Sequence, residues 1–271
     1  MVSGLGSRLS DDREHLRQTF DEAAAGYHTA RPRYPEELFD AIARSVDVTT
    51  PHVLEIGPAT GVATVPMARR GWRIDAIELG TSLAVAARSN TADLPGVKIV
   101  HDSFDSWSPD RWGRYDLVVA ATAWHWLDPA TRYERAHRHL RTGGTLAFWS
   151  ATHVVPAGGD PFFAEIQDVY DEIGESRGDE PWIRPGQVPT SVEEIVGTEL
   201  FDDVIVHQFD WEVTYDADGY LALLDTFSGH LTMNFAQRGR LYGEIRRRLA
   251  ARPGGTLRRH WGAALHLARR R

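Results

Sequence analysis

The chain of 271 residues contains no cysteine. This absence excludes disulfide bonds, metal sites built on thiolates and a cysteine nucleophile. Long apolar runs are also missing, since none approaches the ~18 residues that span a membrane. The first residues lack the basic and apolar segments of a secretory signal peptide. We therefore expect a cytoplasmic protein without membrane association. We also expect no metal site, because no His or Asp residues show the spacing of metal ligands.

Lysine is almost absent, and the basic residues are nearly all arginine. The net charge of −8 argues against a general nucleic-acid binder, which needs a basic surface for phosphate contacts. One segment departs from this balance because eight arginines crowd it: Arg238, Arg240, Arg246, Arg247, Arg248, Arg252, Arg258 and Arg259. We interpret them as a solvated helix face, and the alternative is a site for an anionic ligand or RNA.

Strands and helices alternate between residues 52 and 150. The hydrophobic pattern predicts strands at 52–57, 73–78, 97–102, 115–122 and 144–150. Helices are expected between them at 60–70, 81–90 and 129–141. Gly71 and the pair Gly143 and Gly144 come just past two of these helix ends, where left-handed C-caps are needed. This alternation indicates an α/β fold with a parallel sheet and right-handed crossovers.

The regions on either side of this alternation have other patterns. Residues 11–30 predict a helix, and a second helix starts at Pro35. Residues 151–200 are rich in proline and glycine and predict an insert of short helices and loops that caps one edge of the sheet. The last part of the sequence predicts strands at 203–214 and 256–268, with helices at 216–226 and 236–251 between them. Such late strands suit an antiparallel edge on a parallel sheet.

The most informative segment is His52 to Gly61, an apolar run that ends in an acid and two glycines four residues apart. A strand, a tight glycine turn and a helix N-terminus together form a nucleotide-binding element. Glu78 ends the next strand, where an acid can accept hydrogen bonds from both ribose hydroxyls. These features fit a nicotinamide dinucleotide and S-adenosylmethionine alike. Glu55 favours S-adenosylmethionine. A carboxylate there would repel the pyrophosphate of a dinucleotide, whereas it suits the ammonium and sulfonium groups of S-adenosylmethionine. The loop also lacks the Gly-x-Gly-x-x-Gly spacing.

Residues 55–61, Glu-Ile-Gly-Pro-Ala-Thr-Gly, resemble motif I of the class I S-adenosylmethionine-dependent methyltransferases. Residues 115–129 are similar to the fourth-strand motif of the small-molecule branch often called type 11, and residues 140–146 to the usual start of strand five. Residues 27–35 resemble the N-terminal segment of that branch. The resemblance implies S-adenosylmethionine as cofactor. It also implies a doubly wound, seven-stranded, mostly parallel sheet with an antiparallel last strand, a helical N-terminal lid and an insert after strand five.

The resemblance also implies which residues bind the cofactor. Carried over position by position, they are Tyr27, Arg31, Glu55, Gly57, Pro58, Ala59, Thr60, Gly61, Glu78, Leu79, Asp102, Ser103, Phe104, Thr122 and Trp126. Residues 102–104 match the turn that holds the adenine edge, and Arg31 on the lid suits a carboxylate. Most members have glycine where Ala59 stands, so the backbone there must stay in a region open to alanine. We expect an Ala59→Gly variant to bind the cofactor at least as tightly.

Trp124, His125 and Trp126 follow the fourth strand at the ligand end of the sheet. His125 is our candidate catalytic residue, a general base, because the pKa of histidine lies near neutrality. The two tryptophan rings suit a sulfonium, since cations favour ring faces. The alternative is that Trp126 packs in the core and His125 only lines the cleft or contacts the cofactor. Methyl transfer to a carboxylate or an amine needs no strong base, because alignment supplies much of the acceleration.

The sequence divides into four predicted parts. They are a helical lid over 1–50, an S-adenosylmethionine-binding core over 51–150, a cap over 151–200, and C-terminal strands and helices over 201–271 that complete the sheet. The leading hypothesis is a methyltransferase that moves a methyl group to an O, N or C atom of a small molecule by in-line displacement. One alternative is a related fold that catalyses another reaction or only binds the cofactor. The other, a nicotinamide-dependent oxidoreductase, is disfavoured by Glu55. We expect a monomer or a homodimer.

Overall fold

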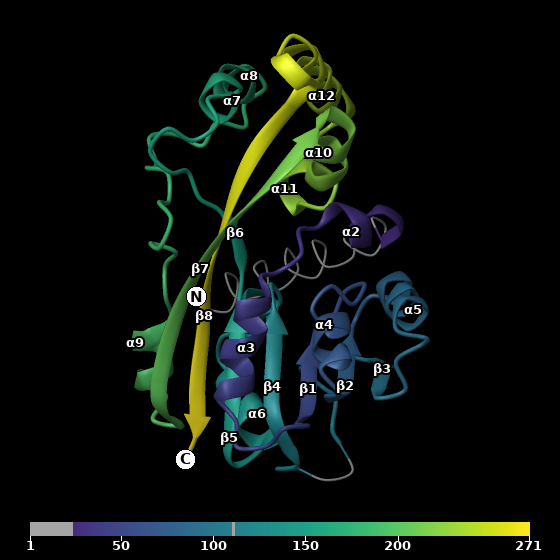
Figure 1. The fold of residues 1–271 in the computed structure, drawn as a ribbon, viewed down its shortest axis with the longest axis vertical. Helices are drawn as coiled ribbons and strands as arrows, with labels where there is room; N and C mark the ends of the chain where they lie inside the picture. The colour runs from purple at the N-terminus through teal and green to yellow at the C-terminus, as the bar shows by residue number, and fades with distance from the viewer. Residues whose placement is uncertain (1–23, 110–111) are drawn as a thin grey trace, which may run out of the picture.

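A mixed β-sheet forms the lower half of the molecule, and helices cover both of its faces (Figure 1). The computed structural model describes residues 24–109 and 112–271. Five strands form the parallel part of the sheet: β1 (His52–Ile56), β2 (Arg73–Glu78), β3 (Val97–His101), β4 (Tyr115–Ala121) and β5 (Leu140–Trp149). Their spatial order is β3, β2, β1, β4 and β5, and each neighbouring pair is parallel. The predicted doubly wound α/β sheet is therefore confirmed.

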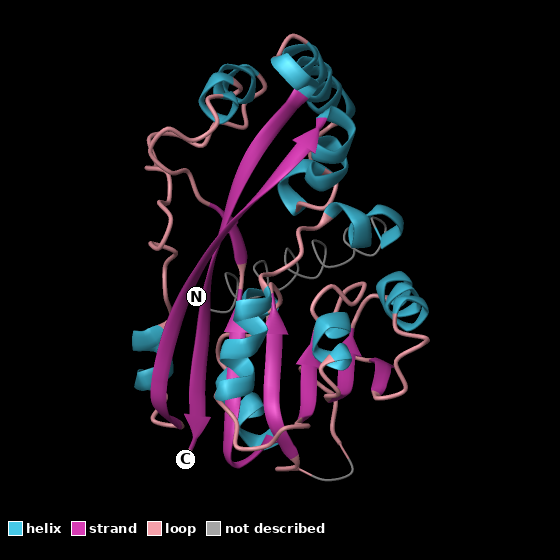
Figure 2. Cartoon of the chain, in the orientation of Figure 1, coloured by secondary structure: helices cyan, strands magenta, loops and turns pink. Residues whose placement is uncertain are grey.

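Two long antiparallel strands complete the sheet. β8 (Thr256–Arg270) pairs with β5 on one edge and with β7 (Phe201–Asp216) on the other. A short strand, β6 (Ala151–His153), pairs with β8 beyond the end of β5. The predicted strands are all present, and β6 is an additional one, which makes the sheet eight-stranded. Figure 2 shows that β7 and β8 rise well above the parallel strands.

Helices on the two faces of the sheet bury alternate residues of the same strand. Leu117 and Val119 of β4 contact the cluster of α3 (Glu36–Arg44) and α4 (Thr64–Arg69), whereas Val118 joins the cluster of α6 (Arg132–His139). Side chains alternate between the faces of a strand, so a strand buried on both sides is apolar throughout. Two more helices contact sheet strands, α5 (Thr81–Asn90) at β3 and α9 (Val192–Gly197) at β7.

A second, mainly helical lobe surrounds the upper ends of β7 and β8 (Figure 1). Its helices are α7 (Phe162–Glu165), α8 (Gln167–Glu172), α10 (Ala217–Leu224), α11 (Ser228–Leu231) and α12 (Phe235–Ala250). All of them except α11 contribute to a hydrophobic cluster of their own, which includes Trp261 of β8 and is separate from the two clusters of the sheet. The segment 151–200 thus contributes α7 and α8 to this lobe and α9 to the side of the sheet. The division into four parts stays a prediction.

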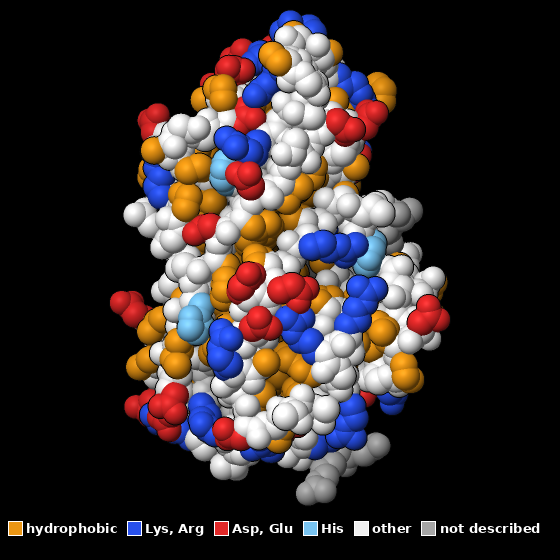
Figure 3. Space-filling model, in the orientation of Figure 1, with side chains coloured by type: hydrophobic (Ala, Val, Ile, Leu, Met, Phe, Trp, Pro, Cys, Tyr) orange, Lys and Arg blue, Asp and Glu red, His pale blue; other side chains and the backbone are white. Residues whose placement is uncertain are grey.

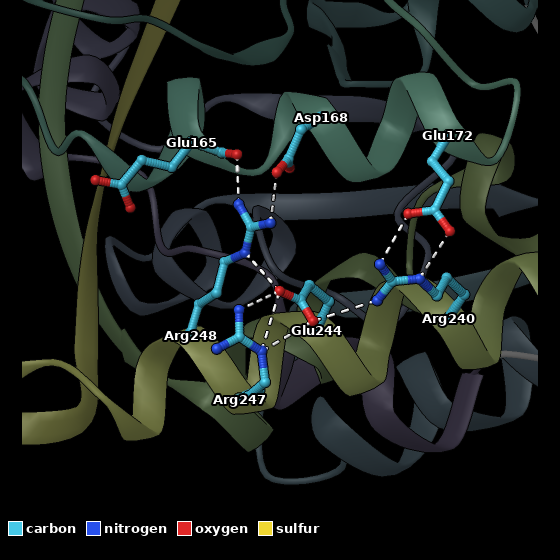
Figure 4. A network of polar contacts seen from close by, with 7 residues as sticks. All are labelled: Glu165, Asp168, Glu172, Arg240, Glu244, Arg247 and Arg248. Carbon is cyan, nitrogen blue, oxygen red and sulfur yellow. Dashed lines mark hydrogen bonds and ion pairs between the residues drawn. The ribbon is translucent and has the colours of Figure 1, made fainter.

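An ion-pair network fastens α12 to α7 and α8 (Figure 4). Its members are Glu165, Asp168, Glu172, Arg240, Glu244, Arg247 and Arg248. Glu244 accepts hydrogen bonds from Arg247 at 2.5 Å and Arg248 at 2.9 Å, which hold the pKa of its carboxyl well below the usual range. Arg248 also pairs with Asp168 at 2.7 Å. The network uses the charges of several tail arginines to join helices.

Several predicted boundaries differ from the structure. The helix predicted over 60–70 begins only at Thr64, because the left-handed residues Ala59 and Gly61 turn the chain before it. Gly71 has φ 82° directly after this helix, as predicted for a C-cap. The prediction for Gly143 and Gly144 was wrong, because α6 ends at His139 and the next residue is already extended. These two glycines instead lie in an irregular part of β5, where the pairing with β4 shifts register.

Two further observations concern the ends of the chain and its helices. Of the helix predicted over 11–30, α2 (Ala24–Ala30) is described, and residues 11–23 lie outside the described part. Across residues 24–109 and 112–271, every helix is too short or too polar to span a lipid bilayer.

Gly262 lies where β8 passes between β6 and β7, and it has no room for a side chain. A Cβ atom there would lie 2.6 Å from Cγ1 of Val154 and 2.8 Å from Cγ2 of Val188. Both neighbours are β-branched and stiff at χ1, so they cannot move aside freely. We expect Gly262→Ala to lower the free energy of unfolding by about 1–3 kcal/mol, as overpacking does. Urea denaturation followed by far-UV circular dichroism measures this change.

Gly239 provides the matched control. It lies inside α12, and a Cβ atom there would meet nothing within 4 Å. Gly239→Ala should raise the free energy of unfolding by about 0.5–1 kcal/mol, because alanine is the better helix former. Equal effects of the two substitutions would contradict the steric explanation.

Candidate active site

A cavity of about 900 Å³ opens at the carboxyl ends of the parallel strands. Its wall comes from the loops after β1, β2, β3 and β4, from the N-terminal segment, and from the chain between α10 and α11. In an open α/β sheet this is the edge at which ligands bind. All but two of the residues predicted to bind cofactor or act in catalysis line it: Tyr27, Arg31, Glu55, Gly57, Pro58, Ala59, Glu78, Leu79, Asp102, Ser103, Phe104, Thr122, His125 and Trp126.

The two exceptions, Thr60 and Gly61, shape the loop from behind. Gly61 has φ 90°, and its N–H donates to the carbonyl of Pro58 at 2.8 Å, which closes the turn. Thr60 is fully buried, and its Oγ1 lies 3.2 Å from Nδ1 of His28. The structure therefore places these two residues at the support of the loop and not at the cavity wall.

The loop after β1 is held in a left-handed conformation. Gly57 has φ 62°, and a Cβ atom there would lie 2.8 Å from Cβ of Ala123. Only glycine fits such a position without strain. Ala59 has φ 50°, in the small left-handed region that alanine enters at a cost. Alanine can therefore adopt the backbone conformation that the loop requires, but glycine would adopt it at a lower cost.

Glu55 ends β1 as a fully buried carboxyl group. Neither of its oxygens has a hydrogen-bond partner among the described residues. Burial raises the pKa of Glu55 to about 8, and the charge of Glu78 adds to this effect while the Thr64 hydroxyl opposes it. A buried polar group without a partner is costly. Because Glu55 also lines the cavity, a ligand with a positively charged donor would complete it.

Glu78 ties two loops together at the end of β2. One carboxylate oxygen accepts from the N–H of Ala59 at 2.9 Å, and the other from the N–H of Gly80 at 2.8 Å. Each carboxylate oxygen has a second lone pair, so both can accept a further hydrogen bond from a ligand. The side chain borders the cavity at the same time. Its position thus fits the predicted role toward ribose hydroxyls.

The turn after β3 is rigid. Oδ1 of Asp102 accepts from the N–H of Ser103 at 2.7 Å, while Phe104 is buried in the hydrophobic core. Arg135 of α6 donates to the carbonyl of Phe104 at 2.6 Å and to that of Trp107 at 2.9 Å. These contacts hold the edge of the cavity in one conformation. The Arg135 contacts could not be read from the local sequence, because the residue comes from a later helix.

The end of β4 carries backbone strain. Thr122 has φ 57°, which is uncommon for a β-branched residue and typical of functional sites. Its Oγ1 lies 3.0 Å from the Tyr34 hydroxyl, so the end of β4 is tied to the N-terminal segment. In the short helix η1 (Trp124–Trp126), Trp124 is buried and stacks on Phe148 at 4.8 Å. The expectation that both tryptophans face a sulfonium is wrong for Trp124, while Trp126 lines the cavity.

His125 lines the cavity, and its side chain is exposed there. Desolvation by the protein around the ring lowers the pKa of His125 to about 4, and the positive charges of Arg132 and Arg31 add to the effect. The ring is therefore neutral at neutral pH. A neutral imidazole can accept a hydrogen bond, but one with so low a pKa is a weak base.

The N-terminal segment contacts this site through several side chains. Arg31 donates to the carbonyl of Thr226 at 2.7 Å, and its guanidinium lies 4.9 Å from the ring centroid of Tyr27 and 4.7 Å from that of Phe227. His28, which sequence reasoning did not assign, contacts the carbonyl of Thr60 at 3.1 Å. This segment thus bridges the glycine loop and the helical lobe, as a lid over the cavity would.

Comparison with known proteins agrees with this geometry. A family profile described as a methyltransferase domain matches residues 53–144. An uncharacterised methyltransferase of Mycobacterium tuberculosis is 25% identical over 246 residues, which cover 90% of this chain and 91% of that protein. A solved structure from Anaeromyxobacter dehalogenans, assigned as a type II methyltransferase, has a TM-score of 0.63 and 23% identity over 88% of this chain and 97% of that one. These matches identify the protein as an S-adenosylmethionine-dependent methyltransferase.

A second solved structure has the same fold and aligns with a slightly larger share of this chain than the first one does. An N-methyltransferase from Haemonchus contortus, in complex with S-adenosylhomocysteine, has a TM-score of 0.52 and 13% identity over 92% of this chain and 57% of that one. The protein is therefore an enzyme that moves a methyl group from S-adenosylmethionine to a small-molecule acceptor. The two alternative functions are not favoured.

The cavity of the methyltransferase fits this cofactor. The unpartnered carboxyl of Glu55 matches an ammonium group, and the left-handed loop at Gly57 leaves a cradle that a Cβ atom would fill. The volume of about 900 Å³ lies in the range of small-molecule sites, ~300–1,000 Å³.

Ala59 offers a direct test of the loop conformation. Because its φ is 50°, we expect Ala59→Gly to raise the free energy of unfolding by about 1 kcal/mol, as relief of left-handed strain does. The affinity for S-adenosylhomocysteine, measured by calorimetry, should stay equal or increase. Ala68→Gly inside α4 is the matched control and should cost about 0.5–1 kcal/mol of stability. Marked loss of affinity in Ala59→Gly would contradict the loop conformation.

Proposed function

We propose that the methyltransferase holds S-adenosylmethionine in the large cavity with its ammonium group at Glu55 and its ribose at Glu78. The unpartnered, fully buried carboxyl of Glu55 carries this proposal. Glu78 supports it, because its carboxylate is fixed at the end of β2 by the N–H groups of Ala59 and Gly80 and the residue borders the cavity. When bound, S-adenosylmethionine supplies an electrophilic methyl group on a sulfonium sulfur.

The adenine end is assigned to the turn after β3. Asp102 provides a carboxylate there, and Phe104 provides a buried ring behind it. Arg135 keeps the turn fixed through its bonds to the carbonyls of Phe104 and Trp107. We propose that residues 102–104 therefore bind the base without rearrangement, which lowers the entropic cost of binding.

The acceptor is assigned to the part of the cavity between the sheet and the helical lobe. Four residues line this part: Arg31 of the lid, Thr152 of β6, Phe227 just before α11 and Ser228 at the start of α11. In Figure 3, hydrophobic side chains gather in the waist between the two halves of the molecule. A small acceptor entering there would meet apolar side chains together with the guanidinium of Arg31.

His125 is proposed as a hydrogen-bond acceptor that orients the acceptor molecule. Its neutrality at neutral pH follows from desolvation by the cavity wall and from the charges of Arg132 and Arg31. A bound sulfonium would add a further positive charge and keep the imidazole neutral. Alignment of the nucleophile with the methyl group then supplies most of the acceleration. The assignment of His125 as a general base stays a prediction.

Cofactor binding should release a proton from Glu55. With a pKa of about 8, this carboxyl is mostly protonated at pH 7, and an ammonium beside it favours the ionised form. Calorimetric titration of S-adenosylhomocysteine at pH 7, in buffers of different ionisation enthalpy, should show release of up to about one proton. A binding enthalpy that does not depend on the buffer would contradict the assignment. Absence of any binding would overturn the proposed cofactor site.

Glu55→Gln is the matched control variant. It should show no proton release and bind S-adenosylhomocysteine about tenfold or more weakly, because a charge-assisted hydrogen bond is lost. The folded-state pKa of Glu55 lies above its ordinary value of 4.5, so ionisation of the unfolded chain destabilises the ligand-free protein as pH rises from 4.5 to about 8. The stability of Glu55→Gln relative to the original should therefore increase over this pH range.

His125 can be tested by the pH dependence of the rate. An acceptor is first identified by the mass gain of one methyl group across a panel of carboxylates, phenols and amines. With a pKa of about 4, His125 should leave no inflection in kcat/KM between about pH 5.5 and 8. His125→Gln should lower kcat/KM by less than about tenfold, because glutamine keeps a hydrogen-bonding group. An inflection near pH 6.5 that vanishes in His125→Gln would instead support a general base.

A further inference from the structure

A smaller cavity of about 250 Å³ lies in the helical lobe beside the large one. Phe227 lines both cavities and forms part of the partition between them. The smaller cavity is lined mainly by rings, including those of Phe163, Tyr170 and Trp182. Arg259 also borders it, from the start of β8. Apart from Phe227, none of these residues has a role in the site described above.

Arg259 differs from the other arginines of the tail. Seven of the eight arginines that crowd residues 238–259 form an ion pair with a carboxylate. The pairs are Arg238–Asp225, Arg240–Glu172, Arg246–Asp218, Arg247–Glu244, Arg248–Asp168, Arg252–Asp160 and Arg258–Glu212. Figure 3 shows basic and acidic side chains mixed over this lobe, and Figure 4 shows several of the pairs. The cluster is thus largely neutralised, which disfavours a broad surface for RNA.

Within the described part of the chain, Arg259 has no acidic partner at all. Its side chain is buried, with the residue only 8% exposed, and its Nε has no hydrogen-bond partner. Nη1 makes one long contact of 3.4 Å with the Tyr220 hydroxyl. The guanidinium instead lies among aromatic rings, 4.5 Å from the centroid of Trp261 and 5.5 Å from that of Phe227. A buried cation without a counterion is costly, so its retention points to a ligand that supplies the negative charge.

The other polar groups around this cavity are compatible with an anion. His230 is neutral at neutral pH, since burial and the charge of Arg259 lower its pKa to about 4. Its Nε2 lies 2.9 Å from the Tyr170 hydroxyl, and its Nδ1 is buried without a partner. Glu175 is exposed and accepts from Gln237 at 3.4 Å, and Arg177 stacks on Trp182 at 3.8 Å. The lining of the cavity therefore contains two cations, two nitrogen atoms without a hydrogen-bond partner, and one carboxylate, which is exposed.

We propose that the smaller cavity binds the carboxylate of the acceptor, with Arg259 as the anion-binding residue. The planar guanidinium suits a carboxylate, and the surrounding rings suit a planar or apolar body. The nucleophilic atom of such an acceptor extends past Phe227 toward the cofactor cavity. This inference rests on the proposed function and narrows it to acceptors that carry a carboxylate apart from the methylated atom. Arg259 is a binding and positioning residue and does not touch the methyl group.

Phenylacetate and its neutral isostere phenylacetamide serve as probes. Both are titrated into the full-length protein by calorimetry and by tryptophan fluorescence, since Trp182 borders the cavity. We expect phenylacetate to bind about tenfold or more tightly than phenylacetamide, because only the acid pairs with Arg259. Arg259→Met should remove this preference, and Arg259→Lys should keep part of it. Equal binding of the two probes, or an unchanged preference in Arg259→Met, would overturn the proposal.

Arg258→Met is the matched control, because Arg258 is adjacent but exposed and pairs with Glu212 at 3.7 Å. It should bind phenylacetate within about twofold of the original protein.

The melting temperature separates a binding role of Arg259 from a structural one. Without ligand, Arg259→Met should melt no lower than the original, because a buried unpaired charge is removed, and a clear drop in melting temperature would contradict the proposal. The same titrations with S-adenosylhomocysteine distinguish the proposed cofactor site from the proposed carboxylate site. Unchanged affinity of Arg259→Met for that compound supports a separate carboxylate site, whereas failure of the original protein to bind it concerns the cofactor site alone.

Discussion

Strand β8 is hydrogen-bonded along both of its edges, and this double pairing determines how the two halves of the molecule meet. On one edge it continues the parallel sheet through β5 and β6, and on the other it pairs with β7 over almost its whole length. The strand is longer than the parallel strands, so its upper part leaves the sheet and enters the helical lobe (Figure 1). Both cavities lie along this junction. The absence of a side chain at Gly262, in the middle of β8, lets the strands and the loop at Val188 approach each other closely.

Among the described residues, the interior retains two ionisable groups without a counterion, a carboxyl group and a guanidinium. Glu55 borders the large cavity, and Arg259 borders the small one. Each costs stability in the ligand-free protein: the neutral Glu55 carboxyl is buried without a hydrogen-bond partner, and the Arg259 charge is buried without a counterion. The same property makes each a specific site: the carboxyl favours a cation and the guanidinium an anion. Elsewhere in the lobe, as at Glu244, the charges are paired and serve to join helices.

The site could be predicted from the sequence where it is built from short segments. The loop after β1, the acid at the end of β2 and the turn after β3 each lie within a few residues of a strand end. Because parallel strands end at one edge of the sheet, these segments meet without further information. Residues that depend on packing were harder to place. The Trp124 ring was considered as a face for the sulfonium but packs on Phe148, and His28 was not assigned although it supports the loop at Thr60.

The sequence by itself determined the alternation of strands and helices, the nucleotide-binding loop and the choice of cofactor, because these depend on local periodicity and on acids at fixed offsets from glycine. It also indicated the crowded arginines near the C-terminus, but not which of them is unpaired. Only the tertiary structure decided that, because the partners Asp160, Asp168 and Glu172 come from a distant segment of the chain. The left-handed backbone at Ala59, the low pKa of His125 and the partition at Phe227 were likewise decided by packing, since each depends on neighbours that are remote in sequence.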